Sequence, residues 1–230
     1  MNNNIVVVVA TRVDKNSFFS KTATGRTLVP YLKDGLKLCL FENNRLGLPR
    51  VYNRALEDTT DTDTDTIFVF LHDDIYLTDF FWPNRVVTAL GHFDLVGLAG
   101  NKRRVARQPS WAFINDSFVW DEISNLSGVV GHGNVPADAN ISYFGVVRQR
   151  VALLDGLFLA AHKRFFVDNN IRFDEQFNFH FYDLDICRQA EERGLRCGTW
   201  DISVVHQSGG SFGSRDWIGE KDKYFDKWRE

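Results

Sequence analysis

The sequence has little cysteine, no long apolar run and no basic leader. Cys39, Cys187 and Cys197 are the only cysteines among 230 residues and form no CxxC pair, so neither a disulfide framework nor a cysteine zinc site is indicated. No apolar stretch approaches the roughly 18 residues that a transmembrane helix needs. The first residues also lack the basic segment and cleavage site of a secretion signal. We therefore expect a cytoplasmic protein without a transmembrane segment, for which peripheral contact with the inner membrane face stays open.

The chain also lacks an excess of positive charge. Lys and Arg number 27 against 30 Asp and Glu, which gives a formal net charge of −3. General nucleic-acid binding needs clustered cations that displace counterions, so we expect no nucleic-acid partner. What the chain has in abundance is phenylalanine, with 20 residues, and tryptophan, with six. These side chains suit a large core, and a length of 230 residues suits one domain.

Apolar runs alternate with helical patterns along the first hundred residues. The β-branched run IVVVVAT at Ile5–Thr11 is typical of a strand buried on both faces. Further strands are predicted over Leu36–Phe41, Ile67–Leu71 and Leu95–Ala99, and helices over Leu48–Asp58 and Asp79–Leu90. This order predicts an α/β protein with a mostly parallel central sheet and right-handed crossovers.

The second half of the chain is less regular at first. Residues 101–150 contain glycines, a basic run at Lys102–Arg107 and few periodic signals, so we predict an irregular segment. Regular structure is predicted again over Val151–His162, as two strands with a turn at Asp155-Gly156. A helix over Asp183–Arg193, a strand over Arg196–Val205 and a helix from Asp216 follow.

Polar residues follow three of the predicted strands. They are Thr11 and Arg12 after the first strand, Glu42 and Asn43 after the second, and His72, Asp73 and Asp74 after the third. In open α/β sheets, ligands bind at the carboxyl edge, where the strand order switches. The sequence therefore predicts a ligand site built from these strand ends.

The adjacent carboxylates of Asp73 and Asp74 repel each other unless something neutralises them. A divalent cation, Mn²⁺ or Mg²⁺, neutralises the repulsion and keeps positions open for phosphate oxygens. A plain turn cap is the alternative. Later in the chain, Asp183 and Asp185 begin a predicted helix and His206 follows a predicted strand. A histidine and an aspartate pair at one sheet edge can share a metal, whereas His72 is left outside the predicted metal site.

The order of these pieces resembles a nucleotide-sugar glycosyltransferase of the GT-A fold, of the family 2 type. It is similar in particular to compact bacterial glycosyltransferase-like domains whose third strand ends in hDD and whose later segment reads F-H-x-Y-D-x-D. That segment is FHFYDLDIC here, Phe179–Cys187, and VVH at Val204–His206 also matches. The resemblance implies a three-layer α/β/α sandwich in a single domain, residues 1–230. Residues 1–100 would form the nucleotide-binding half, 101–215 the acceptor and catalytic half, and 216–230 a C-terminal helix.

The resemblance also implies a donor site. Asp74, with His206, would hold the metal that bridges the diphosphate, and Asp73 would lie near the ribose or sugar, as in a DxD motif. Six further residues are implied to contact the nucleotide sugar, with a UDP-sugar favoured: Thr11, Arg12, Glu42, Asn43 and, at a backbone turn near the sugar, Asp155 with Gly156. The implied process is bacterial polysaccharide biosynthesis, with a glycan or lipid-linked acceptor.

The catalytic base is implied by the same comparison. Asp183 aligns with the acidic residue that serves as general base in inverting members, with Asp185 as the second candidate. Tyr182 stands where the motif has a glutamate. A helix N-terminus lowers the pKa of a carboxyl group, which opposes this role, and Asp183 as a simple helix cap is the structural alternative. Trp111 and Trp120 are candidates for acceptor contact.

Two other classes of function stay open. Sugar-phosphate nucleotidyl transfer uses a related fold and the same metal chemistry, but usually has a glycine-rich phosphate loop after the first strand, which ATRVDKNSFFSKTATG does not match. A non-catalytic domain that binds a carbohydrate or a partner is the second alternative, and retention of Asp73, Asp74, Asp183 and His206 argues against it.

Overall fold

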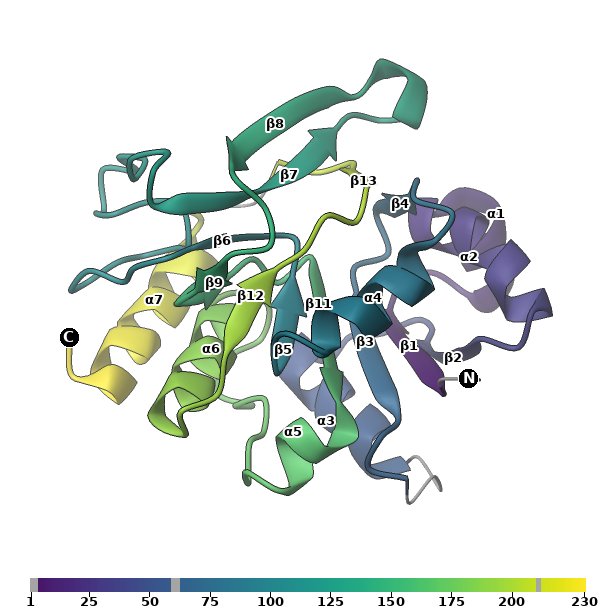
Figure 1. Ribbon diagram of the computed structural model, residues 1–230, viewed down its shortest axis with the longest axis horizontal. Coiled ribbons are helices and arrows are strands. Elements are labelled where there is room, and N and C mark those ends of the chain that lie inside the picture. The colour runs from purple at the N-terminus through teal and green to yellow at the C-terminus, as the bar shows by residue number, and fades with distance from the viewer. Residues whose placement is uncertain (1–3, 59–62, 210–211) are drawn as a thin grey trace.

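The computed structural model describes residues 4–58, 63–209 and 212–230 (Figure 1). Within these residues a seven-stranded sheet has the order β2-β1-β3-β11-β5-β12-β9. Its strands are β1 (Ile5–Ala10), β2 (Lys37–Phe41), β3 (Ile67–Leu71), β5 (Leu95–Gly97), β9 (Arg150–Val151), β11 (Phe158–His162) and β12 (Cys197–Thr199). Strands β11 and β9 run against the other five. The predicted mostly parallel central sheet is therefore confirmed.

A second sheet lies beyond the carboxyl edge of the first (Figure 1). Its order is β10-β6-β7-β13-β4, with β8 paired to β7. Its strands are β4 (Ile75–Leu77), β6 (Ala99–Asn101), β7 (Leu126–His132), β8 (Asn140–Gly145), β10 (Leu153–Leu154) and β13 (Val204–His206). The chain passes directly from β3 to β4, from β5 to β6 and from β12 to β13. The single strands predicted over Leu95–Ala99 and Arg196–Val205 are therefore each two strands in different sheets.

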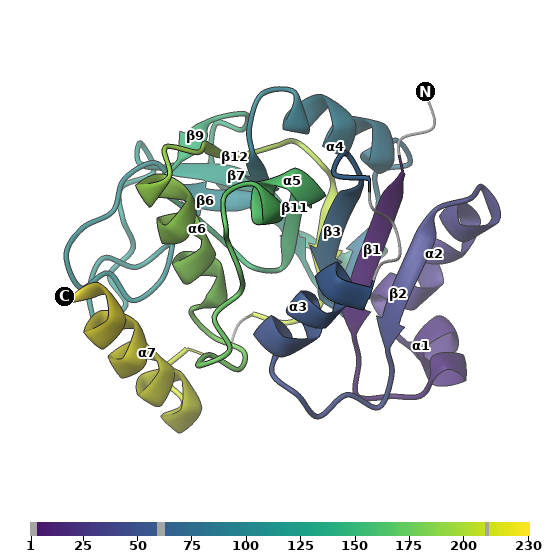
Figure 2. The same ribbon diagram turned by 90° about the horizontal axis from the view of Figure 1, so that it is seen from below.

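Helices cover both faces of the first sheet. They are α1 (Lys15–Lys21), α2 (Ala23–Lys33), α3 (Leu48–Asp58), α4 (Trp82–Leu90), α5 (Lys163–Val167), α6 (Tyr182–Glu192) and α7 (Arg215–Trp228), with a 3-10 turn at Pro136–Asp138. Helices α3 and α4 lie on opposite sides of β1 and β3 (Figure 2). Helix α3 has the predicted bounds. Helix α4 begins later than predicted, at Trp82, which puts Pro83 in the first turn, where its missing N–H costs no helical hydrogen bond.

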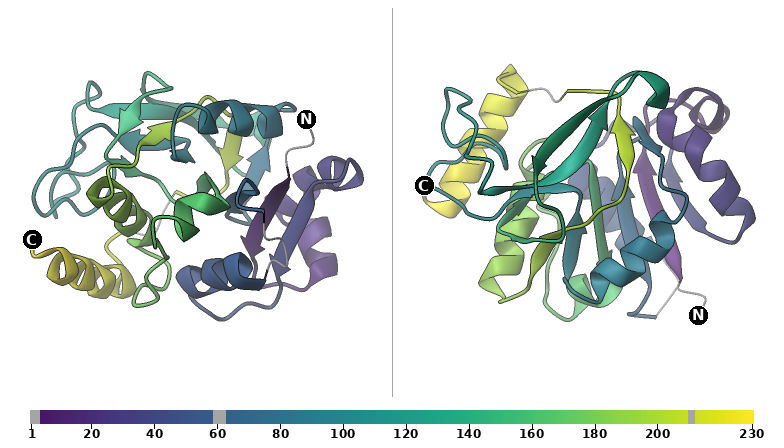
Figure 3. Two further views of the ribbon diagram at one scale, coloured as in Figure 1. Left: turned by 60° about the horizontal axis from the view of Figure 1, so that its bottom comes forward. Right: turned by 45° about the horizontal axis from the view of Figure 1, so that its top comes forward.

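The prediction of an irregular segment over residues 101–150 is wrong for its second half. Strand β7 lies there inside the second sheet and is mostly buried, and β8 pairs along it as a more exposed strand (Figure 3). Glycines in LSGVVGH weaken the strand pattern in the sequence. One of them, Gly128, has φ +128° beside a β-bulge and lies so close to the Leu98 carbonyl that a Cβ there would overlap it. Close packing thus requires a glycine at a position where glycine weakens the strand pattern of the sequence.

Strands β1 and β3 form the centre of the core. All five residues of β3 and Ile5–Val9 of β1 are buried, as the continuous apolar runs predict. Helix α7 turns Trp217, Tyr224 and Phe225 inward, where each is less than 5% exposed. These three rings pack on the protein and are not presented to a membrane. No helix in the described ranges has the length and apolar character needed to cross a bilayer.

Candidate active site

The ends of β1 and β3 bring Thr11 and Asp73 together. Thr11 is buried, and its hydroxyl donates a hydrogen bond of 2.6 Å to Oδ2 of Asp73. Strands β1 and β3 are parallel neighbours, so their carboxyl ends meet at one edge. Two residues predicted to contact the nucleotide sugar are thus held against each other, and the Asp73 carboxylate has a fixed orientation.

Asp74 meets His206 on the other side of the same turn. Strand β13 pairs antiparallel with β4, and His206 lies opposite Ile75. Nε2 of His206 is 3.3 Å from Oδ2 of Asp74 and 2.9 Å from the hydroxyl of Ser208. The structure therefore unites the two residues that the sequence assigns to a metal, although 132 positions separate them in the chain.

His72 lies beside Asp74 and His206 and completes a group of three possible metal ligands. One ligand atom each of His72, Asp74 and His206 lies within 4.8 Å of the others, which is the spacing of a metal centre. Oδ1 of Asp74 is buried and has no hydrogen-bond partner in the described part of the chain. A buried carboxylate oxygen left unpaired is costly unless a cation is bound. The three side chains therefore fit a divalent metal, and sequence reasoning missed His72 as a member.

The Asp74–His206 contact fixes the charges of the pair. Burial by itself raises the pKa of Asp74, but the hydrogen bond from His206 and the positive charge of the ring lower it to about 2. Burial lowers the pKa of His206, and the bond to Asp74 more than offsets this, so that the pKa of His206 is raised. The two shifts favour the charged forms of both groups, and a metal would compete with a proton for the imidazole.

Asp183 lies across the same cavity, in the first turn of α6. Its Oδ2 accepts a hydrogen bond from the Gly156 N–H at 3.0 Å, and its Oδ1 one from the Leu184 N–H at 2.9 Å. The cap residue of α6 is Phe181, whose side chain makes no capping bond. Asp183 is therefore not the helix cap.

The pKa of Asp183 differs from what its place at a helix N-terminus suggests. Burial, with the negative charge of Asp155 as the second cause, raises it to about 7. The backbone N–H groups of Leu184 and Gly156 lower it, but by less. A carboxyl group with this pKa can accept a proton near neutral pH, which is the property of a general base.

Asp155 is held in place from a distant segment. The indole N–H of Trp111 donates to its Oδ2 at 2.6 Å, and the Leu157 N–H donates to its Oδ1 at 2.9 Å. Gln108 fixes the loop, since its amide donates to the carbonyl oxygens of Ser110 and Trp111. The loop between β6 and β7 thus reaches into the catalytic half of the cavity through Trp111.

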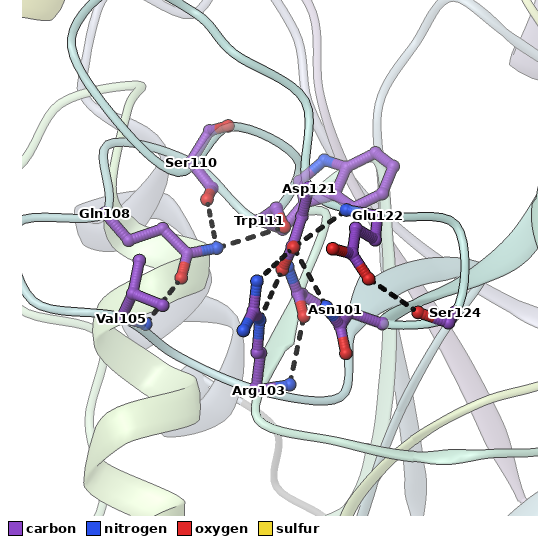
Figure 4. A network of polar contacts seen from close by, with 10 residues as sticks. Asn101, Arg103, Val105, Gln108, Ser110, Trp111, Asp121, Glu122 and Ser124 are labelled. Atoms are coloured by element: carbon purple, nitrogen blue, oxygen red, sulfur yellow. Dashed lines mark hydrogen bonds and ion pairs between the residues drawn. The ribbon is translucent and has the colours of Figure 1, made fainter.

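An ion pair between a buried carboxylate and an exposed arginine anchors the base of this loop (Figure 4). The Asp121 side chain accepts hydrogen bonds from the Arg103 guanidinium and from the Asn101 amide. The Arg103 hydrogen bond, against the opposing effect of burial, lowers the pKa of Asp121 below its usual range. Asp121 is therefore ionised at neutral pH, and removing Arg103 would leave a buried charge unpaired.

The metal group and Asp183 line one cavity of about 560 Å³. Besides the carboxylates and histidines, aromatic side chains form its walls. Trp111, Phe113 and Trp120 come from the loop between β6 and β7, Phe144 from β8, Phe179 from the segment before α6 and Phe212 from the segment before α7. The Trp120 ring is 51% exposed and stacks on Phe144 at 14° and 5.8 Å. The cavity thus combines polar groups with an aromatic wall, which we call the aromatic cleft.

Four residues predicted at the nucleotide end, Thr11 among them, do not line this cavity. Arg12 is exposed after β1, and Glu42 accepts a hydrogen bond from the Lys15 N–H at 2.6 Å. Asn43 bonds through its backbone to Val13. These three lie at the strand ends beside Thr11, which is connected to the cavity only by its hydrogen bond to the lining residue Asp73.

Asp185, the second candidate for the base, also lies outside the cavity. Its side chain points to α7, where it accepts a hydrogen bond from Trp228 Nε1 at 2.9 Å and pairs with Lys227 at 2.6 Å. It is fully buried in this position. The surroundings of Asp185 therefore indicate that it joins α6 to α7.

Comparison with known proteins identifies relatives of the sequence and of the fold. Residues 43–227 match the model of a family described as glycosyltransferase-like. No curated protein sequence matches the chain.

Two solved structures share the fold. One is GalNAc-T7 with UDP, GalNAc and Mn²⁺, with a TM-score of 0.54 and 11% identity over 97% of this chain. The other is the catalytic domain of Drosophila β1,4-galactosyltransferase 7 with xylobiose, with a TM-score of 0.52 and 9% identity over 96% of this chain. The matches cover 48% and 80% of those chains, so this chain spans about half of the first. At these identities the likeness shows the fold alone.

Proposed function

Because the chain belongs to the glycosyltransferase-like family that its residues 43–227 match, we propose that it transfers a sugar from a nucleoside-diphosphate sugar to a hydroxyl acceptor with the help of a divalent metal. The GT-A fold predicted from the sequence is confirmed by the structural neighbours. The observation that carries the proposal is the arrangement of one cavity, in which the His72–Asp74–His206 group faces a carboxyl group whose pKa is about 7.

Each group in the cavity has a separate role in the proposed reaction. We assign Asp73, which Thr11 orients, to the ribose or sugar of the donor, and the backbone turn at Asp155-Gly156 to the sugar; support for this comes from their shared place in the cavity lining. A bound cation supplies positive charge to the diphosphate as it leaves. Asp183 removes the proton of the acceptor hydroxyl as its oxygen attacks the anomeric carbon. Inversion at that carbon follows from a single displacement.

The donor set favours Mn²⁺ over Mg²⁺. Two imidazoles and one carboxylate suit a transition metal, whereas Mg²⁺ prefers oxygen ligands alone. The structure of GalNAc-T7 also holds Mn²⁺ and UDP. We therefore propose a UDP-sugar with Mn²⁺ as the first combination to examine.

The aromatic cleft supports a glycan acceptor. Trp120 lines the cavity and is about half exposed, and a flat apolar ring suits the C–H face of a sugar. Xylobiose is bound in the structure of the Drosophila galactosyltransferase. A lipid-linked glycan remains compatible with this proposal, as do a cytoplasmic location at the inner membrane face and a role in bacterial polysaccharide biosynthesis.

Nucleotidyl transfer is not favoured by any feature of the site. The connection from β1 to α1 is Thr11–Asp14 and has no glycine to wrap a phosphate. A non-catalytic binding domain has no need for a carboxyl group with a strongly raised pKa in a cleft, and such groups concentrate at catalytic sites.

Ligand binding tests the proposal directly. The melting temperature with Mn²⁺ and UDP together is expected to rise by about 5–10 °C, because a ligand at 100 times its Kd adds about 2.7 kcal/mol and each 1 kcal/mol is worth about 2–4 °C for a chain of this size. The controls are UDP with EDTA and Mn²⁺ alone. If UDP, GDP and dTDP, each with Mn²⁺, all leave the melting temperature unchanged, the proposal is wrong.

The rate of transfer is expected to depend on pH through Asp183. Its carboxyl group must be ionised to accept a proton, so kcat/KM should fall about tenfold per pH unit below the pKa and level off above it. The expected midpoint lies near pH 7, given the pKa of about 7. A profile of initial rates from pH 5 to 9, with the donor that binding identifies, measures it. A midpoint near pH 4 would contradict the assignment of the base.

A further inference from the structure

The hydroxyl of Tyr182 touches two groups of the site at once. It lies 2.9 Å from the Gly156 carbonyl oxygen and 3.1 Å from Nε2 of His72. A carbonyl oxygen only accepts hydrogen bonds, so the hydroxyl donates its proton to Gly156. Both contacts can then be hydrogen bonds only if Nε2 of His72 carries a proton and donates it to the tyrosine oxygen.

We propose that Tyr182 is a positioning residue that holds His72 in the tautomer with its proton on Nε2, so that Nδ1 is the nitrogen that His72 offers to the cation. This inference rests on the proposed metal-dependent function. Hydrogen bonds to the second nitrogen of a metal-binding histidine fix its tautomer and ring orientation. The hydroxyl of Tyr182 therefore serves the metal side of the cavity.

The surroundings keep this hydroxyl in place. Tyr182 is 2% exposed, and its ring packs edge-on against Tyr52 at 5.8 Å. Phe179 stacks on the His72 ring at 5.6 Å and 28°, which limits rotation of the imidazole. A Cβ at Gly156 would overlap the Tyr182 hydroxyl. The glycine predicted to approach the donor therefore has a second role, because only a residue without a side chain lets the tyrosine reach its carbonyl.

Metal affinity and tautomer test the inference together. Tyr182→Phe is expected to weaken binding of Mn²⁺ alone, measured by calorimetry, by about 10- to 100-fold, as loss of a supporting hydrogen bond does at other metal sites. In the metal-free wild-type protein at pH 8, long-range ¹H–¹⁵N spectra should show His72 protonated at Nε2. In Tyr182→Phe this preference should be lost.

Tyr224→Phe is the matched control. It removes the hydroxyl of another fully buried tyrosine, which does not line the cavity. The variant should keep both the Mn²⁺ affinity and the His72 tautomer. Wild-type His72 protonated at Nδ1 would overturn the inference even if Tyr182→Phe does not fold.

The outcomes separate this inference from the function on which it rests. Wild-type protein that binds no Mn²⁺ overturns the proposed function and the ligand role of His72 together. Wild-type and Tyr182→Phe proteins that bind Mn²⁺ equally tightly overturn the role of Tyr182 alone.

Discussion

Asp183→Asn is expected to lower kcat at least about a hundredfold, and up to about ten-thousandfold, which is the usual contribution of a positioned general base. Asparagine keeps the shape and one oxygen for the Gly156 or Leu184 N–H, but it cannot accept the proton of an acceptor hydroxyl. Binding of UDP with Mn²⁺ should be unchanged, since Asp183 is not part of the metal group. Single-turnover transfer and calorimetric binding measure the two effects separately.

Asp183→Asn is also expected to change how the free energy of unfolding depends on pH. The pKa of Asp183 is about 7 in the folded protein and 3.8 as its ordinary value, so the unfolded chain loses this proton first. Stability contributed by the protonated group is therefore complete below pH 4 and is lost as the pH rises to 7. Because a tenfold change in a proton affinity is worth about 1.4 kcal/mol, this loss reaches up to about 4 kcal/mol.

Asp183→Asn should not lose this stability. The free energy of unfolding of the variant minus that of the wild type is therefore expected to rise between pH 4 and pH 8, whatever constant amount the lost hydrogen bond costs. Chemical denaturation at the two pH values measures the difference. A flat difference would mean that the carboxyl group has an ordinary pKa.

Asp185→Asn decides between the two candidate bases. Asp185 is fully buried against Trp228 and Lys227 and lies outside the cavity, so its substitution should leave the proton transfer to Asp183 intact. Rates of transfer by the two variants, measured side by side, make the comparison. If Asp183→Asn retains transfer and Asp185→Asn abolishes it, the base is Asp185 and the roles of the two carboxyl groups are reversed.

The metal-binding residues Asp74 and His206 could be predicted from the sequence, because apolar runs mark the strands that end beside them. The run ending at Leu71 and the strand ending at His206 bring Asp74 and His206 to one edge, and the pattern alone indicates both. His72 was missed although a signal existed: in extended chain, residues two apart point the same way. His72 and Asp74 indeed share the metal group, while Asp73 turns to Thr11.

The pKa of Asp183 and the role of Trp111 depend on contacts between distant segments, which no local sequence pattern predicts. The raised pKa of Asp183 arises from burial and from Asp155, which is 28 positions earlier in the chain. The helix terminus, which is visible in the sequence, predicts the opposite shift. Trp111 was expected at the acceptor, and its bond to Asp155 depends on the folding of a loop whose periodicity is weak. Electrostatics set by tertiary packing are therefore the part that the sequence does not reveal.

Asp74→Ala is expected to abolish the joint stabilisation by Mn²⁺ and UDP and to weaken binding of Mn²⁺ alone by about a hundredfold or more, since it removes the single carboxylate from the group of three ligands. The metal-free variant should also be less stable than the wild type at pH 7. The lowered pKa of Asp74, about 2 against 3.8, represents up to about 2 kcal/mol, reduced by solvent screening. That contribution is present above pH 4 and is lost as the pH falls through 2.

Asp73→Ala is the matched comparison, because it removes the neighbouring carboxylate and its bond to Thr11 without touching the three ligands. It should leave binding of Mn²⁺ alone intact and weaken binding of the UDP-sugar. Calorimetry with Mn²⁺ alone, then with UDP in excess Mn²⁺, distinguishes the two variants. If Asp73→Ala loses Mn²⁺ and Asp74→Ala keeps it, the two aspartates exchange roles. If neither variant loses Mn²⁺, the metal centre lies elsewhere, and the unpaired Oδ1 of Asp74 has another explanation.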